Sequence, residues 1–285
     1  MTEEADRRQI PLALTIAGSD SSGGAGLQAD LKTFSAFGVY GLTAVTCVVA
    51  EVPGKVSRIE GVDPEMVRAQ LELLLSKLPV AVIKTGLLFS AEVVEIVATV
   101  LEKHARKIPL VVDPVMIATS GDRLLQPAAI ELYRTRLFPL ATLVTPNLAE
   151  AAALTNSTVE NLEQMRTAGA QLQDKYGTRF LLKGGHLEGE RAIDLLFDGA
   201  ATREFSAPHI AGVSTHGTGC TYSAAITAGL ARGRPLTDAI DEAKEFVSAA
   251  ISGHFSWGTS LGEIHALNHL GEAAPFRNQS SAASR

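Results

Sequence analysis

Short runs of apolar and β-branched residues alternate along the chain with longer segments whose apolar residues recur at helical spacing. The short runs, which predict buried strands, are Leu12 to Ala17, Val80 to Thr85, Leu110 to Asp113, Thr142 to Thr145 and Arg179 to Lys183. The predicted helices are Leu27 to Phe37, Ala91 to His104, Gln164 to Tyr176, Cys220 to Ala231 and Leu236 to Phe255. This alternation is typical of an α/β fold, in which helices cover both faces of a mostly parallel sheet.

Two regions depart from this rhythm. Ala44 to Ala50 and Lys55 to Ile59 predict two strands around a Pro-Gly turn, which we interpret as a small β flap beside the main sheet. Ala192 to Phe197 and Thr202 to Ala207 predict an antiparallel pair at the sheet edge. The sheet is therefore expected to be mixed at its borders.

The chain shows no internal repeat and no Pro/Ser-rich linker, so we expect one domain from residue 10 to residue 271. Residues 1–9 are polar and acidic, which predicts a flexible N-terminus. Residues 272–285 are polar and rich in small side chains, which predicts a disordered tail.

Composition narrows the kinds of partner. The net charge of −6 leaves no basic stripe, which argues against a nucleic-acid partner. No apolar run reaches the roughly 18 to 20 residues that span a bilayer, so a membrane protein is not expected. The chain has only two cysteines, Cys47 and Cys220, and a polar start, which favours a reducing cytoplasm. Small molecules are the expected ligands.

Polar and glycine-rich segments follow several of the predicted strands. They are Gly18 to Gly26, Lys84-Thr85-Gly86, Asp113-Pro114, Thr145-Pro146-Asn147 and Lys183-Gly184-Gly185-His186. Ligands of such sheets bind outside the carboxyl ends of the strands. We therefore expect these segments to share one cleft.

The first glycine-rich loop matches two nucleotide-binding patterns incompletely. Gly18 to Ala25 has the outline of a phosphate-binding loop, but Gly24 stands where lysine is required and Ala25 where serine or threonine is required. The stretch from Gly24 onward satisfies the dinucleotide pattern, with Glu51 at a tolerable distance for a ribose contact. A polar insert separates that pattern from the strand, which argues against a dehydrogenase.

A second glycine loop, Gly217 to Thr221, precedes a predicted helix and carries Cys220. Such a loop directs unpaired backbone N–H groups and the positive end of the helix dipole at one place. Its two glycines favour a reactive, partly ionised thiol. The alternative is an inert cysteine packed on a buried helix. His216, beside this loop, is expected to form a hydrogen bond to backbone.

The combination of these loops with charged strand ends indicates phosphoryl transfer from a nucleotide. Catalysis of that reaction rests on positioning and charge neutralisation. The amides of Gly217 to Cys220 are placed to hold the transferred group, and Asp113 and Glu150 are candidate Mg²⁺ ligands, directly or through water. The alternative reading makes these two carboxylates a loop residue and a first-turn helix residue.

These motifs together resemble those of the hydroxymethylpyrimidine/phosphomethylpyrimidine kinases of thiamine biosynthesis, which belong to the ribokinase-like superfamily. The matching blocks begin at Ala17, Lys84, Asp113, Thr145, Lys183 and His216. They occur in order between about Ile10 and Trp257. The resemblance implies a three-layer α/β sandwich and an enzyme that uses ATP and Mg²⁺ to phosphorylate 4-amino-5-hydroxymethyl-2-methylpyrimidine and then its monophosphate.

The resemblance also implies roles for individual residues. Cys220 is the implied base, and the amides of Gly217, Thr218, Gly219 and Cys220 form the anion hole. Asp30, Glu51, Ala25 and Leu87 are implied on the pyrimidine side, and Asn147, Lys183, Asp113 and Glu150 on the nucleotide and metal side. A homodimer through the segment from Gly41 to Glu60 is a further expectation.

One residue departs from the family pattern. Glu51 stands where the family usually has glutamine, and an ionised glutamate only accepts hydrogen bonds, whereas glutamine also donates. We hypothesise that Glu51 keeps pyrimidine binding but tightens it as the pH falls toward the pKa of the ring nitrogen. Two alternatives stay open, namely a pyridoxal or pyridoxine kinase on the same scaffold and a protein that binds the pyrimidine without phosphorylating it.

Overall fold

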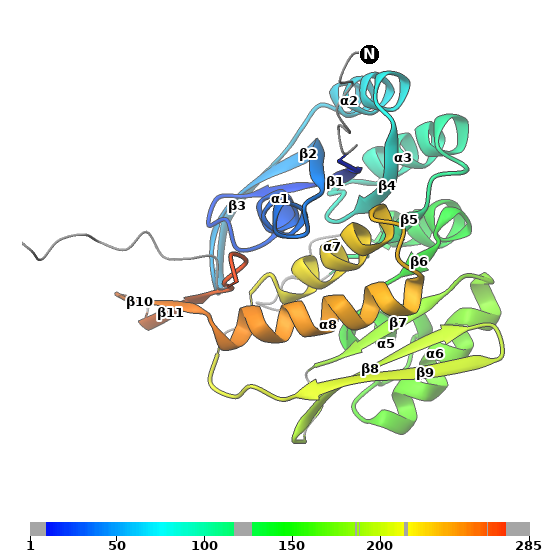
Figure 1. The fold of residues 1–285 in the computed structure, drawn as a ribbon. Helices are drawn as coiled ribbons and strands as arrows, with labels where there is room; N and C mark the ends of the chain where they lie inside the picture. Colours follow the sequence, from blue (N-terminus) through cyan, green and yellow to red (C-terminus); the bar gives the residue numbers. More distant parts are fainter. Residues whose placement is uncertain are drawn as a thin grey trace, which may run out of the picture.

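A nine-stranded sheet forms the centre of the computed structural model, which describes residues 10–116, 127–185, 187, 189–213, 216–260 and 262–271 (Figure 1). The order within these residues is β3-β2-β1-β4-β5-β6-β7-β8-β9. The bounds are β1 (Leu12–Asp20), β2 (Tyr40–Val52), β3 (Lys55–Gly61), β4 (Val80–Thr85), β5 (Leu110–Val112), β6 (Leu143–Val144), β7 (Phe180–Gly184), β8 (Arg191–Asp198) and β9 (Ala201–Pro208). The six central strands β2, β1, β4, β5, β6 and β7 run parallel to one another. The strands β3, β8 and β9 pair antiparallel with their neighbours.

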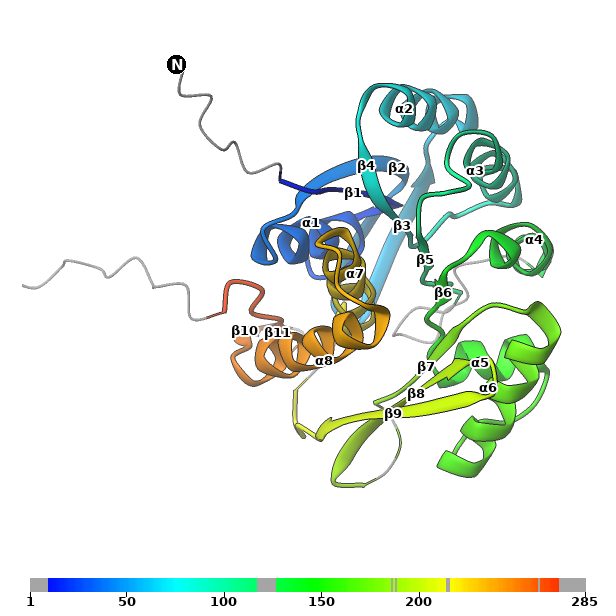
Figure 2. The same cartoon turned by 45° about the vertical axis from the view of Figure 1, so that its right-hand side comes forward.

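Helices form a layer on each face of this sheet (Figure 2). The helices are α1 (Gly26–Ala36), α2 (Pro64–Lys77), α3 (Ala91–His104), α4 (Pro127–Leu132), α5 (Leu148–Thr155), α6 (Leu162–Tyr176), α7 (Thr218–Ala231) and α8 (Leu236–Ser252), with short helical turns at Tyr133–Leu137 and Phe138–Leu140. One apolar core joins the sheet to α2 through α6, and two smaller ones lie beneath α1, α7 and α8. The expected mostly parallel, three-layer α/β architecture is confirmed.

Local sequence signals explain where several helices begin. Asp63 accepts hydrogen bonds from the amides of Glu65 and Met66 at the start of α2, and Pro64 occupies the first helical position. Ser90 caps α3 by accepting from the amide of Val93. These contacts satisfy amides that have no partner within the helix.

The predicted strand pair near residue 50 is present, but it belongs to the main sheet. β2 and β3 pair antiparallel as far as Val52 and Lys55. β2 also pairs parallel with β1, from Leu12 opposite Tyr40 to Asp20 opposite Val49. The hairpin is therefore an extension of the central sheet, because β2 continues beyond the end of its parallel partner β1. The predicted antiparallel edge pair is confirmed as β8 and β9.

The C-terminal region differs from the prediction. Helix α8 ends at Ser252 instead of Phe255, and the chain forms a hairpin of β10 (Phe255–Thr259) and β11 (Gly262–Ala266). The pattern of residues did not predict this hairpin, because its first strand is short and exposed along its whole length, so that Phe255 was assigned to the preceding helix. Helices α2 and α4 were also not predicted, and α5 entered only through the alternative reading of Glu150 as a first-turn helix residue. The predictions for residues 1–9 and 272–285 lie outside the described residues.

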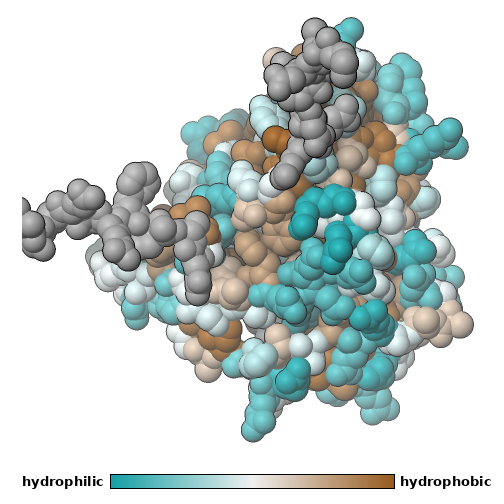
Figure 3. Space-filling model, in the orientation of Figure 1, coloured by the Kyte–Doolittle hydropathy of each residue, from teal (hydrophilic) through white to brown (hydrophobic). Residues whose placement is uncertain are grey.

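The surface agrees with this arrangement of layers. Hydrophilic side chains dominate the face above β8 and β9 in the space-filling view (Figure 3). β9 forms the sheet edge and exposes Arg203 and Glu204, whose charges discourage pairing with another chain. None of the helices in the described part of the chain combines the length and apolar character needed to cross a bilayer.

Candidate functional site

A cavity of about 420 Å³ opens at the carboxyl ends of the parallel strands. Among the residues that line it are all but one of the site residues predicted from the sequence: Ala25, Glu51, Leu87, Asp113, Asn147, Glu150, Lys183, Gly217, Thr218, Gly219 and Cys220. The exception is Asp30. Segments separated by almost 200 residues thus meet at one edge of the sheet, as parallel topology requires.

The first glycine loop is organised around the carboxylate of Asp20. This group accepts hydrogen bonds from the amides of Ser22, Gly24 and Ala25 at 2.7, 3.1 and 2.7 Å. Burial by itself raises the pKa of Asp20, but hydrogen bonds from His216, Ser22 and Ala25 outweigh it and hold that pKa well below its usual range. The polar insert is therefore a fixed turn that leads into α1.

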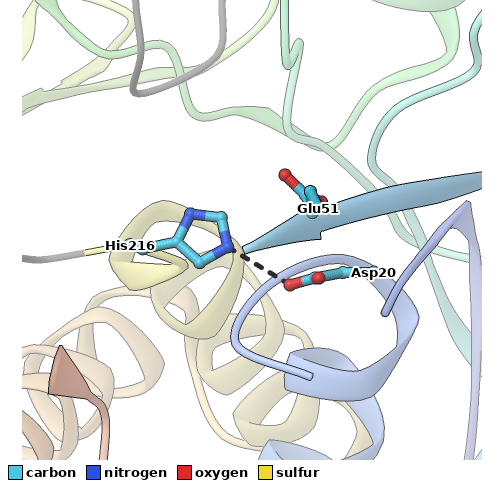
Figure 4. Close-up of side chains that lie close together, drawn as sticks. All are labelled: Asp20, Glu51 and His216. Atoms are coloured by element: carbon cyan, nitrogen blue, oxygen red, sulfur yellow. Dashed lines mark hydrogen bonds and ion pairs between the residues drawn. The ribbon is translucent and has the colours of Figure 1, made fainter. Parts of the chain in front are cut away.

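The second glycine loop packs directly on the first. Gly217 has a φ of +82°, and a Cβ at this position would lie 1.8 Å from the carbonyl oxygen of Gly24, so only glycine fits. His216 Nε2 lies 3.2 Å from Asp20 Oδ2 (Figure 4). The expectation that His216 bonds to backbone is therefore wrong. A buried carboxylate lies within reach of its ring and is the stronger acceptor.

Cys220 lies in the first turn of α7, is partly buried and lines the cavity. The backbone of Gly26 acts to lower the pKa of the Cys220 thiol. Burial raises the pKa of the thiol to about 12; Lys84 opposes this shift, and Asp113 adds to it. The prediction of a partly ionised sulfur is therefore wrong, because the loss of hydration raises the pKa of the thiol by more than the helix N-terminus lowers it.

Asp30 does not face the cavity, which corrects the role implied for it. Its side chain is completely buried, and Oδ2 accepts hydrogen bonds from Thr15 Oγ1 at 2.5 Å and from Lys84 Nζ at 3.0 Å. α1 packs on β1 and turns this position toward the sheet. A buried carboxylate there needs a cation, and Lys84 supplies it.

Lys84 itself was noted only as the end of a strand. It is fully buried, yet it is among the residues that line the cavity. The available signal was a lysine inside the otherwise apolar run Val80 to Thr85, since a buried ammonium requires a charged partner.

Asp113 and Lys183 form an ion pair in the wall of the same cavity. Lys183 Nζ lies 2.9 Å from Asp113 Oδ1, and Thr145 donates to the same oxygen at 3.2 Å. Ser223, one turn into α7, donates to Oδ2 at 3.0 Å. A Cβ at Gly219 would lie 3.2 Å from Lys183 Nζ, so the glycine loop adjoins this ammonium.

Glu150 and Asn147 form a capping box at the start of α5. Asn147 Oδ1 accepts from the amide of Glu150, and Glu150 Oε2 accepts from the amide of Asn147, both at 2.9 Å. The amide of Met116 donates to Oε1 at 3.2 Å. Burial raises the pKa of Glu150 to about 7; Lys183 opposes the shift, and Asp113 adds to it. The reading of Glu150 as a first-turn helix residue is thus correct, and the residue also lines the cavity.

Glu51 is the penultimate residue of β2 and contacts the first glycine loop. Ser21 Oγ donates to its carbonyl at 2.8 Å and accepts from its amide at 2.9 Å, which fixes the backbone. The side-chain ligand atoms of Glu51, Asp20 and His216 all lie within 4.8 Å of one another (Figure 4). Burial and the charge of Asp20 raise the pKa of Glu51, while His216 lowers it. Glu51 is therefore part of the cavity wall.

The comparisons with known proteins agree with this geometry. The family model described as phosphomethylpyrimidine kinase matches residues 20–265. A hydroxymethylpyrimidine/phosphomethylpyrimidine kinase of Rhizobium meliloti is 45% identical over 89% of this chain and 96% of its own. A thiamine biosynthesis bifunctional protein of Geobacter sulfurreducens is 45% identical over 93% of this chain, which spans 54% of that protein's length. An ADP complex of Bacillus subtilis pyridoxal kinase superposes with a TM-score of 0.83 at 37% identity, covering 92% of this chain and 98% of the other.

Proposed function

The chain belongs to the phosphomethylpyrimidine kinase family, and from this membership we infer that it phosphorylates 4-amino-5-hydroxymethyl-2-methylpyrimidine with ATP. It then phosphorylates the monophosphate to the diphosphate. The observation that carries this proposal is the meeting of the Gly217 to Cys220 loop with the Asp113–Lys183 pair at one cavity. A protein that only binds the pyrimidine would have no use for this combination.

The nucleotide phosphates are assigned to the side of the cavity formed by Lys183 and Asn147. Asp113 holds the Lys183 ammonium at 2.9 Å and keeps it charged, because a nearby carboxylate raises the pKa of that amine against the effect of burial. The ammonium adjoins Gly219, so it and the loop amides neutralise charge on the same phosphoryl group. The N-terminal end of α7 adds a favourable dipole.

Magnesium is assigned to Asp113 and Glu150. Both carboxylates are buried at the cavity, and hard oxygen donors suit this ion. Their oxygens already accept bonds from Lys183, Thr145, Ser223 and backbone amides, which fits a hydrated ion held through water better than direct ligation. When bound, the ion neutralises charge on the nucleotide phosphates.

The pyrimidine is assigned to the side formed by Glu51, Ala25 and Leu87. Leu87 supplies an apolar wall, and Glu51 supplies the polar group that faces the ring. Cys220 ends the phosphate loop and lines the same cavity, and we assign it the role of accepting the proton of the substrate hydroxyl. In the second phosphorylation the acceptor is already a phosphate anion, so that step needs no base.

The difference between the two acceptors gives the test of this proposal. Cys220→Ala is expected to lower kcat of the first phosphorylation by about 100-fold, the usual contribution of a general base, and to change the second by less than about threefold. A product-resolved assay with each acceptor measures both steps. Cys47→Ala, which removes the other cysteine, is the matched control. Equal losses in both steps would remove Cys220 from the role of base.

Pyridoxal phosphorylation is the second candidate function. It is favoured by the likeness to the solved structure of Bacillus subtilis pyridoxal kinase. We expect a higher kcat/KM for the hydroxymethylpyrimidine than for pyridoxal, because the family model and the Rhizobium meliloti relative carry the pyrimidine kinase description. The reverse order in an ADP-release assay would make pyridoxal the substrate.

We further propose that the protein acts in the cytoplasm as a homodimer through the β2–β3 hairpin. Val48 and Val52 lie exposed on this hairpin, with 51% and 39% of their surface accessible. Burial of such side chains against a second copy removes apolar area from water. Light scattering during size-exclusion chromatography that shows only monomer would refute the dimer.

A further inference from the structure

We propose that Lys84, held in place by Asp30, is a positioning residue for the reaction, because its buried ammonium stabilises the ionised form of Cys220 from beneath the cavity. This inference deepens the proposed function and rests on the assignment of Cys220 as the proton acceptor. It assigns a use to an ion pair that the reaction scheme otherwise leaves without one.

The Lys84–Asp30 pair has an orientation that suits this use. Both side chains are fully buried, and their charged atoms lie 3.0 Å apart. Lys84 lines the cavity but Asp30 does not, so the cavity meets the positive partner first. A Cβ at Gly86 would lie 3.5 Å from Lys84 Nζ, which places the ammonium at the carboxyl end of β4.

Hydrogen bonding within the pair is incomplete. In the part of the chain that the structure describes, Nζ makes one hydrogen bond, to Asp30 Oδ2, although an ammonium carries three donors. Asp30 Oδ1 is buried with no partner there. Replacing a buried ion pair by apolar residues is often neutral or stabilising, so stability is a weak reason for this one. The free donors of Lys84 leave it able to act on a neighbouring charge.

Helix α7, which carries Cys220 in its first turn, packs against β4, which carries Lys84, and both side chains line the same cavity. The charges of Lys84, Asp113 and Asp30 act on the pKa of the Cys220 thiol, and Lys183 is another ammonium that lines this cavity. Lys183 is engaged by Asp113 at 2.9 Å. Lys84 lowers the pKa of the thiol and so favours the thiolate, and the backbone of Gly26 acts in the same direction. Without Lys84, burial and two carboxylates would all oppose ionisation.

The proton balance of the step shows what Lys84 contributes. The thiol first gives its proton to solvent, and Lys84 stabilises the thiolate that remains. As the substrate oxygen bonds to the γ-phosphorus and the bond to the β-phosphate oxygen breaks, the hydroxyl proton passes to the Cys220 sulfur. ADP leaves, and Lys84 keeps its own proton throughout.

Alkylation of Cys220 tests the proposal without relying on turnover. In a Cys47→Ala background Cys220 is the only cysteine, so iodoacetamide reports its thiolate between pH 7 and pH 9. The test variant is Lys84→Met with Asp30→Asn, which removes both charges because Lys84→Met alone leaves a buried unpaired carboxylate. We expect about a tenfold lower alkylation rate, corresponding to about one pKa unit.

A second, largely buried ion pair that also lines the cavity provides the matched control. Lys244 Nζ lies 2.6 Å from Asp194 Oδ2, and neither residue is among the main groups that act on the Cys220 thiol. Lys244→Met with Asp194→Asn is expected to alkylate within about twofold of the parent, a factor that corresponds to about 0.3 pKa unit. Circular dichroism and thermal unfolding verify that both double variants fold. Parental alkylation in the Lys84 variant, or equal slowing in both variants, would overturn the proposal.

Failure of the proposed function and failure of the role of Lys84 give different results in these assays. If the parent enzyme does not phosphorylate the pyrimidine, the proposed function fails, while the alkylation rates still report on Lys84. If the parent is active and the Lys84 variant keeps both its alkylation rate and its first phosphorylation, only the role of Lys84 is lost. Selective loss of the first phosphorylation, together with slow alkylation, supports both.

Discussion

Acid is expected to weaken the attachment of the C-terminal segment to α7 through His269. This imidazole is buried, with 4% of its surface exposed, and Nε2 lies 2.9 Å from the hydroxyl of Thr221, the residue after Cys220. Burial lowers the pKa of His269 to about 4, helped by the charge of Lys32, while a hydrogen bond to the backbone of Leu267 opposes the shift. The native ring is therefore neutral at neutral pH.

The size of the effect follows from proton linkage. Between pH 6.5 and pH 4 the unfolded chain binds a proton at His269 that the native protein does not bind, so the free energy of unfolding decreases as the pH falls. The full difference corresponds to about 3 kcal/mol. Acidification from pH 7 to pH 5 covers most of this window and removes about 2 kcal/mol, or about 3 °C in Tm for a chain of this length.

Urea or thermal unfolding at pH 7 and pH 5 measures this loss, with His269→Gln as the comparison. Glutamine retains an amide that can bond to Thr221 but cannot take up a proton. We expect the acid-induced loss of stability to be about 2 kcal/mol smaller in the variant than in the parent, since the other titrating groups contribute equally to both. An identical loss in the two proteins would refute the assignment to His269.

Two further predictions concern the cavity wall. Gly217→Ala should lower kcat for both phosphorylations by about 100-fold, because its Cβ would displace the Gly24 carbonyl and shift the loop amides. The control is Gly233→Ala, which has a similar φ of +77° but lies in open space and should retain activity. Similar losses of activity in the two variants would point to backbone strain alone. Lower pH should decrease KM for the pyrimidine in the parent but not in Glu51→Gln. The reason is that pairing of Glu51 with the ring requires one added proton on either group, and burial raises the pKa of Glu51. A flat pH profile of KM in the parent would contradict this prediction.

Much of the cleft was predictable because its parts are local signals. Each of these signals involves residues only a few positions apart. They are glycines that need a positive φ or close approach, the Asn147–Glu150 capping box, and charged residues that follow apolar strands. Parallel topology then brings strand ends to one edge. The β10–β11 hairpin escaped prediction because its strands are only five residues long and β10 is exposed throughout.

Charge states and pairings could not be predicted from the chain alone. Asp30 and Lys84 are 54 positions apart, and only the packing of α1 on β1 and of β1 on β4 turns them toward each other. The sequence correctly placed Cys220 at the N-terminus of a helix, but it did not predict the ionisation state of the thiol. Burial raises the pKa of the thiol by more than the helix dipole lowers it.

The linear order of residues thus established the layered architecture, the two loops and the kind of chemistry, because these depend on periodicity and on spacing between neighbours. The folded arrangement established which groups are desolvated and which distant charges face each other. Free energies of burial and Coulomb interaction depend on surroundings drawn from the whole chain, and those surroundings exist only after the sheet has assembled.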